Sequence, residues 1–411
     1  MIKFLLYTIS CAILYNILLC NLCNAYTPDI TRRHAIKVAT LSLSGLPTLA
    51  QSANADTLLL PKATASTAST TSQLQPSVTI KDGKAVLPKL GTGAWAWGDS
   101  LFWGYNPKED SDLQEVFNLA VSSGNGFFDT AELYGLGRSE SLISDFTSQL
   151  PPSLQSGVSV ATKFAPLPWK TTRQDVVKAA KASVARLGGN PIDLYQIHFP
   201  NAYSNSAYWD GLADCYDQGL IRSCGVSNYG KDAVRAVHAR LKERGIPLSS
   251  NQIQMSLIYR PALTTGLKDV CDELGVQTIA YSPLGLGLLT GKYRQGVYPK
   301  GPRKKLAEEL FKNPDCDKLF DVMKEVGRNH DSASLSQVAI NWAITKSSTA
   351  IPGARNLSQA KSNLAALDWK MEEGEVRALD KAAEGIRPVV DPEKSPFPKF
   401  DKDTGLRMFD C

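Results

Sequence analysis

Residues 158–200, VSVATKFAPLPWKTTRQDVVKAAKASVARLGGNPIDLYQIHFP, contain the pattern that decides the fold. The segment begins with an apolar run from Val158 to Lys163 and ends with a second run from Ile192 to His198. Between them, apolar side chains recur at helical spacing across residues 172–187, and Thr172 occupies a suitable N-cap position. The segment therefore predicts a strand, a helix and a second strand.

The same alternation of strand and helix continues along the chain. Further helical patterns span Asp232 to Arg244 and Leu335 to Lys346. Six more apolar runs are candidate strands: Leu90 to Trp95, Gly126 to Asp129, Ile221 to Val226, Asn251 to Met255, Val276 to Tyr281 and Thr349 to Ile351. Eight such repeats favour an α/β fold of the (β/α)8 TIM barrel type, because right-handed crossovers between parallel strands all wind the same way. An open, doubly wound sheet is the alternative.

A hairpin is expected before the first barrel strand. Residues 77–88, SVTIKDGKAVLP, place Asp82-Gly83 between two alternating segments, and this dipeptide favours a tight hairpin turn. We expect this N-terminal β-hairpin to plug the N-terminal end of the barrel. The barrel domain is predicted to span residues 76–411.

The first 75 residues have the composition of targeting segments. Residues 1–25 combine Lys3, an apolar run and small residues at 23 and 25, which predicts a cleavable secretory signal peptide; a membrane anchor is the alternative. Residues 26–75 are predicted to be a transit segment followed by a linker rich in Ser, Thr and Ala. Its Arg32-Arg33 pair precedes a second apolar stretch, which resembles a twin-arginine signal or is a basic patch of an ordinary transit peptide.

Two targeting signals in tandem resemble the precursors of algal plastid proteins, which first enter the secretory route. We therefore expect a plastid (chloroplast) location, and the stroma, a lipid particle and the thylakoid lumen all stay open. No membrane span is expected in the mature chain.

Composition argues against several classes of protein. The formal net charge is +5, and leaving out residues 1–55 lowers the excess to +2, so the sequence has no nucleic-acid footprint. Three of the eight cysteines lie in the leader, and the five that remain, an odd number, are too widely spaced for a zinc pair and make a disulfide scaffold unlikely. Outside the leader only three histidines remain, with no ligand-like spacing, and no metal site is expected. The sequence does not decide between a monomer and an oligomer.

Polar residues follow successive predicted strands at the points where the strands end. Asp129 ends the second strand, with Tyr134 five residues later in FDTAELYG; Lys163 ends the third strand and His198 the fourth. Each residue alone has an ordinary explanation as a turn, packing or solvated residue. Because barrel active sites lie where the strands end, the four together predict a catalytic site.

These motifs resemble the aldo-keto reductase family. The resemblance covers about residues 88–367 and includes GTGAWAWGD (91–99), FDTAELYG, ATKF (161–164), IHFP (197–200), GVSNY (225–229), NQIQMSLIYR (251–260), AYSPLGLGLLTGKY (280–293) and IPGARN (351–356). Within the family, the sequence after the first strand and the long segment after residue 293 resemble the plant plastid and pyridoxal-reductase-like branch.

The resemblance implies an oxidoreductase that reduces an aldehyde or ketone by hydride transfer, with Asp129, Tyr134, Lys163 and His198 as its catalytic tetrad. Tyr134 would be the general acid, since reduction of a carbonyl requires a proton at oxygen. An ammonium such as that of Lys163 stabilises a phenolate, and Asp129 would hold this ammonium by a charge-assisted bond. His198 would orient the carbonyl oxygen.

The resemblance also implies a nicotinamide cofactor and its binding residues. Ser227, Asn228, Gln252 and Tyr281 match the nicotinamide site; Ser282, Leu284, Gly291 and Lys292 match the pyrophosphate strap; Ile351, Gly353, Arg355, Gln359 and Asn363 match the adenosine site. Arg355 favours NADPH over NADH, because a guanidinium pairs well with a 2′-phosphate.

Aromatic residues in the loops after the strands are candidates for substrate contact. We expect Trp97, Phe102, Trp103 and Trp169 to face a small carbonyl substrate that is flat or apolar, with pyridoxal and reactive lipid aldehydes among the candidates. The alternative is an apolar wall that packs on itself. For the whole chain, the alternatives to a reductase are an NADPH-binding regulatory or redox-sensing protein with little turnover and an unrelated barrel such as an isomerase.

Overall fold

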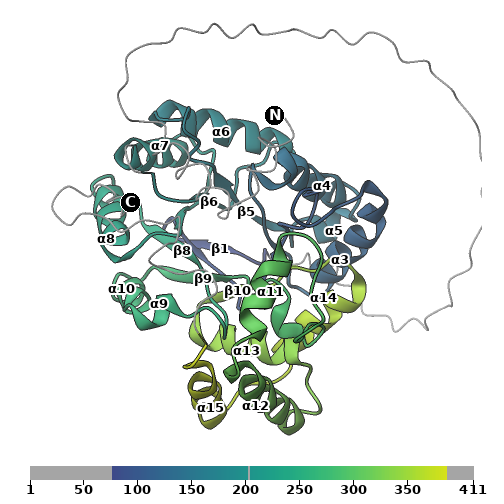
Figure 1. Cartoon of the computed structure of the whole chain (residues 1–411). Helices are drawn as coiled ribbons and strands as arrows, with labels where there is room; N and C mark the ends of the chain where they lie inside the picture. Colours follow the sequence, from purple (N-terminus) through teal and green to yellow (C-terminus); the bar gives the residue numbers. More distant parts are fainter. Residues whose placement is uncertain (1–75, 202–203, 387–411) are drawn as a thin grey trace, which may run out of the picture.

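The computed structural model describes residues 76–201 and 204–386, and Figure 1 shows a ring of strands surrounded by helices. The predicted signal peptide (1–25), the transit segment (26–75) and the end of the predicted barrel domain (387–411) lie outside the described residues. Eight parallel strands follow one another around the ring in chain order. They are β3 (Thr92–Gly93), β4 (Phe127–Asp129), β5 (Ser159–Phe164), β6 (Leu194–Ile197), β7 (Cys224–Ser227), β8 (Leu248–Gln254), β9 (Gln277–Tyr281) and β10 (Thr349–Ile351).

The first and last strands meet and close the barrel. Gly91 N donates to Ala350 O at 2.9 Å, and Gly93 N donates to Pro352 O at 3.0 Å. The backbones approach so closely that a Cβ on Gly93 would lie 2.8 Å from the carbonyl oxygen of Ile351. This closure confirms the predicted (β/α)8 barrel and leaves no unpaired edge between β3 and β10.

Helices cover the outside of the barrel. Between strands lie α3 (Asp110–Ser122), α4 (Arg138–Ser148), α5 (Pro152–Gln155), α6 (Arg173–Arg186), α7 (Asn205–Asp217), α8 (Lys231–Lys242), α9 (Pro261–Thr264), α10 (Leu267–Glu273), α11 (Arg303–Phe311), α12 (Asp315–Asn329) and α13 (Leu335–Lys346). After β10 come α14 (Leu357–Leu364) and α15 (Glu373–Ala383), and α15 packs on α12 at the bottom of Figure 1. No described helix has both the length and the apolar character needed to cross a membrane.

The helix predicted after β5 is α6, and it begins directly after Thr172, the predicted N-cap residue. The Thr172 side chain accepts a hydrogen bond from Asp175 N, and the Asp175 side chain accepts one from Thr172 N, which forms a complete capping box. The long segment after residue 293 contains a further helix, α11, over residues 303–311. Ala307 and Leu310 of this helix are buried in the outer core, and that apolar spacing explains the extra helix.

The hairpin of β1 (Thr79–Lys81) and β2 (Lys84–Val86) plugs one end of the barrel. Its backbone N–H groups donate to side chains near the starts of three barrel strands: Val78 N to Ser159 Oγ (3.1 Å), Ala85 N to Ser249 Oγ (3.0 Å) and Leu87 N to Gln277 Oε1 (3.1 Å). Val78, Ala85 and Leu87 belong to a buried cluster with side chains from β4, β5, β6, β9 and β10. The plug therefore seals the N-terminal end, and only the C-terminal end is left for a site.

Candidate active site

Four polar side chains converge at the C-terminal end of the barrel. Asp129 is the last residue of β4, Lys163 is the fifth residue of β5 and His198 directly follows β6. Tyr134 begins a short 3₁₀ helix, η2 (Tyr134–Gly137), after β4. All four are buried, and the structure brings the predicted tetrad together.

Lys163 and Asp129 form a fully buried ion pair. Lys163 Nζ lies 2.6 Å from Asp129 Oδ2, with side-chain exposures of 0% and 3%. The ammonium also donates to Thr130 O at 2.7 Å. The other carboxylate oxygen accepts hydrogen bonds from Gln252 Nε2 at 2.7 Å and from Gln196 Nε2 at 3.4 Å. A buried charge pair needs such additional partners, since desolvation of both ions is costly.

The Tyr134 ring lies close to both this ion pair and His198. Lys163 Nζ is 5.1 Å from the ring centroid of Tyr134, and the His198 ring centroid is 5.8 Å from it. Gly135, which follows the tyrosine, has a φ of +57°, and a Cβ there would lie 2.5 Å from Gly98 O. A glycine is therefore required directly after Tyr134, because the turn is both left-handed and crowded.

His198 is held in its neutral form. Burial, and secondly the charge of Lys163, lower the pKa of this imidazole well below its usual value. Within the described part of the chain, its Nδ1 is buried and has no hydrogen-bond partner. A neutral imidazole can donate or accept a hydrogen bond at the site but is a poor acid near neutral pH.

A layer of hydrogen bonds behind the tetrad fixes the strand ends. Thr130 Oγ1 donates to Ser139 Oγ at 2.8 Å, and Ser139 Oγ donates to Ala94 O at 3.0 Å. The buried carboxylate of Glu140 accepts from Thr162 Oγ1 and from Arg186 Nε, each at 2.6 Å. These bonds connect the ends of β3, β4 and β5 and restrict the movement of the groups between them.

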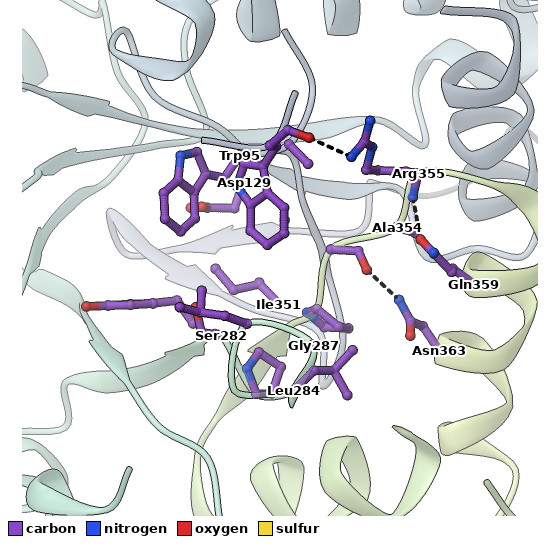
Figure 2. A pocket seen from close by; sticks show the side chains of 18 of the residues that line it. Trp95, Asp129, Ser282, Leu284, Gly287, Ile351, Ala354, Arg355, Gln359 and Asn363 are labelled. Atoms are coloured by element: carbon purple, nitrogen blue, oxygen red, sulfur yellow. Dashed lines mark hydrogen bonds between the residues drawn. The ribbon is translucent and has the colours of Figure 1, made fainter. Parts of the chain in front are cut away.

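The tetrad lies at one end of a cavity of about 510 Å³. In Figure 2, Trp95 and Asp129 lie on one side of the cavity, and Arg355, Gln359 and Asn363 lie on the other. Most of the predicted cofactor residues line it: Ser227, Asn228, Gln252, Tyr281, Ser282, Leu284, Lys292, Ile351, Gly353, Arg355, Gln359 and Asn363. Gly291 and Lys163 do not line the cavity, but Lys163 contacts the lining residue Asp129 and lies close to Tyr134.

Side chains from β7, β8 and β9 form a connected floor beside the tetrad. Ser227 Oγ donates to Gln252 O at 2.9 Å, and Tyr281 OH donates to Asn228 Oδ1 at 3.0 Å. Asn228, with a φ of +62°, also donates from Nδ2 to His198 O at 3.1 Å. The predicted nicotinamide residues are thus joined to one another and to the backbone of the tetrad histidine.

Two further segments of the chain line the cavity. The loop after β9 winds tightly, with positive φ at Ser282 and Leu286, and Figure 2 shows its Ser282, Leu284 and Gly287 along the lower part of the cavity. At the far end, Arg355 N donates to Gln359 Oε1 at 2.9 Å, and Asn363 Nδ2 donates to Gly353 O at 3.3 Å (Figure 2).

The structure separates the four aromatic residues predicted to contact substrate. Trp103 lines the cavity. Trp97 is fully buried in the outer core, where its Nε1 donates to Ala354 O at 2.9 Å. Phe102 does not line the cavity but stacks on Trp95, and Trp169 is 71% exposed and also lies outside the lining.

Several lining residues were not predicted from the sequence. Trp95 lines the cavity and its ring lies 6.2 Å from that of Tyr134, while Phe199, Tyr293 and Arg303 also contribute to the wall. Phe199 follows the tetrad histidine directly, so its position beside a strand end was the available signal. Among residues 76–201 and 204–386, no three His, Cys, Asp or Glu side chains gather in a way that could hold a metal ion.

Comparisons with known proteins agree with this geometry. The chain is 40% identical over 314 residues to a protein named "Pyridoxal reductase, chloroplastic" from Arabidopsis thaliana, covering 74% of this chain and 85% of the relative. It is 34% identical over 315 residues to an uncharacterised oxidoreductase of Mycobacterium bovis, covering 75% and 93%. The Arabidopsis relative supports the expected resemblance to the pyridoxal-reductase-like branch.

Among solved structures, the thermostable aldo-keto reductase Tm1743, crystallised with the inhibitor epalrestat, superposes with a TM-score of 0.58 at 26% identity, over 72% of this chain and 95% of that chain. Residues 89–384 match the sequence model of the Aldo/keto reductase family. The barrel, the cluster at its C-terminal end and these matches lead to one conclusion: the chain belongs to the aldo-keto reductase family of oxidoreductases.

Proposed function

We propose that this protein is an NADPH-dependent reductase that converts an aldehyde or ketone to an alcohol. The observation that carries the proposal is the position of Tyr134 in the wall of the cavity, close to both the buried Lys163–Asp129 pair and the neutral His198. This proximity supports roles for Tyr134 as proton donor, for the ion pair as the group that assists it and for His198 as the orienting group.

The cavity residues fit a nicotinamide cofactor. The cavity is continuous from the tetrad to Arg355 and α14, and its volume of about 510 Å³ is in the range of small-molecule sites. Amide and hydroxyl side chains at 227, 228 and 252 would hold the carboxamide, and Tyr281 offers an aromatic face for the ring. The winding loop from Ser282 to Lys292 would carry the pyrophosphate, and Arg355, Gln359 and Asn363 the adenosine end.

A bound NADPH supplies the hydride to the carbonyl carbon. Tyr134 donates its phenolic proton to the carbonyl oxygen, and the ammonium of Lys163 stabilises the phenolate that is left. Asp129 keeps this ammonium in place through the 2.6 Å bond. Because His198 is neutral, it supplies a hydrogen bond that orients the carbonyl oxygen and does not compete with Tyr134 as the acid.

Arg355 supports NADPH over NADH. Its guanidinium lines the far end of the cavity, and guanidinium groups pair with phosphate dianions through two parallel hydrogen bonds. NADH has only a hydroxyl group at the corresponding position and does not gain this pairing.

The aromatic wall supports a flat or apolar aldehyde as substrate. Trp95 lines the cavity beside Tyr134, and Trp103 also lines it, with its ring centroid 5.4 Å from that of Trp95 in an edge-to-face arrangement. Pyridoxal has a flat ring that this wall accommodates, and the Arabidopsis relative is named a pyridoxal reductase. We place pyridoxal first in the substrate panel and apolar aldehydes second.

The test is turnover of purified protein with NADPH and this panel, compared with the Tyr134→Phe variant. Loss of the phenolic proton should lower kcat by about 10²–10⁴-fold while NADPH binding stays within about twofold, because general acid catalysis is worth that much and the ring remains. Tyr216→Phe is the control, since Tyr216 lies beside Gly83 of the hairpin, at the opposite end of the barrel. Unchanged turnover in Tyr134→Phe would refute the mechanism, and tight NADPH binding without turnover by the wild type would favour a sensing role.

We also propose that residues 1–75 direct the chain to a plastid, with the barrel domain beginning near residue 76. The tandem apolar segments and the chloroplastic relative support this location. A full-length fusion to a fluorescent protein should colocalise with plastid pigment, and deletion of residues 1–75 should abolish the colocalisation. A cytosolic signal from the full-length fusion would contradict the proposal.

A further inference from the structure

The guanidinium of Arg355 already has protein partners. Its Nη2 lies 2.5 Å from Glu109 Oε2, its Nε donates to the same oxygen at 3.2 Å, and its Nη1 donates to Trp103 O at 2.8 Å. Glu109 and Arg355 are 246 residues apart in sequence, and the pairing depends on the packing of α14 against α3, which begins directly after Glu109. The side chains are 29% and 28% exposed, so solvent screens this pair only in part.

We propose that Glu109 is a specificity-determining residue for the cofactor, which lowers the preference for a 2′-phosphate that Arg355 alone would give. This inference rests on the proposed binding of a nicotinamide dinucleotide with its adenosine end at Arg355. The structure assigns Glu109 no role in catalysis, because the side chain does not line the cavity.

The physical reason is competition for one cation. A guanidinium has five N–H groups, and Glu109 and the Trp103 carbonyl engage three of its nitrogens in hydrogen bonds. Glu109 also neutralises the charge that would attract a phosphate dianion, and a carboxylate close to that dianion repels it. A ribose 2′-hydroxyl carries no charge and is compatible with a nearby carboxylate, which accepts hydrogen bonds from such hydroxyls in other dinucleotide sites.

The same contacts extend to the aromatic wall. Among the described residues, the indole Nε1 of Trp103 has no hydrogen-bond partner. The Trp103 ring packs against Arg303, whose Cζ lies 4.8 Å from the ring centroid. The backbone carbonyl of Trp103 accepts a hydrogen bond from Arg355. A ligand that draws Arg355 toward a phosphate therefore changes the support of Trp103, and the change can be followed by tryptophan fluorescence.

The experiment uses two fragments that carry no nicotinamide: 2′,5′-ADP, which has the 2′-phosphate, and 5′-AMP, which lacks it. Calorimetry on the full barrel should show that Glu109→Gln tightens 2′,5′-ADP binding by about three- to tenfold, since one like charge is removed at short range, and leaves 5′-AMP within about twofold. Glu109→Ser, which removes the carboxylate but leaves a helix-capping residue before α3, should give the same gain. Glu273→Gln is the matched control, because Glu273 forms a similar two-bond pair with Arg235 between α10 and α8.

A double variant locates the effect at the arginine. In an Arg355→Met background, Glu109→Gln should give no further gain for 2′,5′-ADP, whereas a merely structural role of Glu109 would alter both ligands in both backgrounds. In the wild type, but not in Trp103→Phe, 2′,5′-ADP should change the tryptophan emission, and 5′-AMP should not.

The outcomes separate this inference from the proposed function. The role of Glu109 would be overturned if 2′,5′-ADP bound equally well to the wild type and both Glu109 variants, or more weakly to the variants. The proposed cofactor would be unaffected by that result. Binding of 2′,5′-ADP by none of these proteins would overturn both the inference and the proposed cofactor. Binding that appears or tightens only when the carboxylate is removed would support both.

Discussion

The side-chain amide of Gln252 donates a 2.7 Å hydrogen bond to Asp129, the carboxylate that holds the buried Lys163. A residue predicted to contact the cofactor is thus also a partner of the buried ion pair that we propose to be catalytic. With Lys163 on one carboxylate oxygen and Gln252 and Gln196 on the other, Asp129 is held from both sides. The pair is therefore fixed in place, and its ammonium lies 5.1 Å from the ring centroid of Tyr134.

Removing the charge of Asp129 should damage both stability and catalysis. Asp129→Asn leaves the Lys163 ammonium buried without its counter-ion, and we expect the free energy of unfolding to fall by about 3–5 kcal/mol. Urea unfolding measures this change. Adding Lys163→Met to Asp129→Asn should restore part of the lost free energy of unfolding but should not restore turnover. Asp210→Asn is the control, since Asp210 pairs with Arg240 at the surface and should change stability by less than about 1 kcal/mol.

The neutral His198 predicts how stability depends on pH. In the unfolded chain the imidazole has a pKa of about 6.5. Burial and Lys163 hold its pKa well below that value in the fold, so below about pH 6.5 the unfolded state binds a proton that the folded state does not. The free energy of unfolding should therefore decrease on acidification, by up to about 1.4 kcal/mol per pH unit from this group.

His198→Gln should remove that part of the slope. Unfolding in urea at several pH values between 7 and 5 compares the variant with the wild type. His238→Gln is the control: partial burial and Lys242 also lower the pKa of His238, but the side chain is only half-buried and its effect should be smaller. An identical pH slope in wild type and His198→Gln would contradict the neutral state of the buried imidazole.

The three tryptophans predicted to face substrate should behave differently from one another. Trp103→Ala should raise KM for an aromatic aldehyde by about two- to tenfold, because Trp103 lines the cavity. Trp97→Ala should lower the free energy of unfolding by about 3–5 kcal/mol, because the ring is fully buried. Trp169→Ala should change neither quantity, since the side chain is exposed outside the cavity. If Trp169→Ala were the one variant that raised KM, Trp169 and not Trp103 would be the residue that contacts substrate.

The close approach of β3 and β10 predicts that one added methyl group at Gly93 lowers the stability of the barrel. Gly93→Ala places a Cβ 2.8 Å from a backbone oxygen that is itself part of the barrel, and we expect a loss of about 1–3 kcal/mol in unfolding free energy. Gly374→Ala is the matched control in α15, where nothing lies within 4 Å of the added carbon and a gain of about 0.5–1 kcal/mol is expected. Equal melting temperatures for the two variants would show that the closure tolerates expansion.

The sequence was informative wherever a local pattern determines the structure. The eight apolar runs became eight strands, and the helix over 335–346 begins and ends as predicted, because periodicity and caps act over a few residues. Asp129, Tyr134, Lys163 and His198 could be placed together because parallel strands bring their ends to one face.

Long-range side-chain contacts could not be predicted in this way. Trp95 and Trp97 are two residues apart in one loop, yet the first lines the cavity and the second packs in the outer core. The direction of each side chain depends on turns and on distant partners such as Ala354, which accepts the Trp97 hydrogen bond. The Glu109–Arg355 pair similarly joins residues that share no local signal.

The contact that closes the barrel also sets the order in which the chain can fold. Thr349 Oγ1 donates to Pro88 O at 2.8 Å across 261 residues of sequence. During synthesis, the first strand therefore has no neighbour on one side until the eighth strand has left the ribosome. Pairing over such a distance is slow, so we expect the barrel to close late in folding.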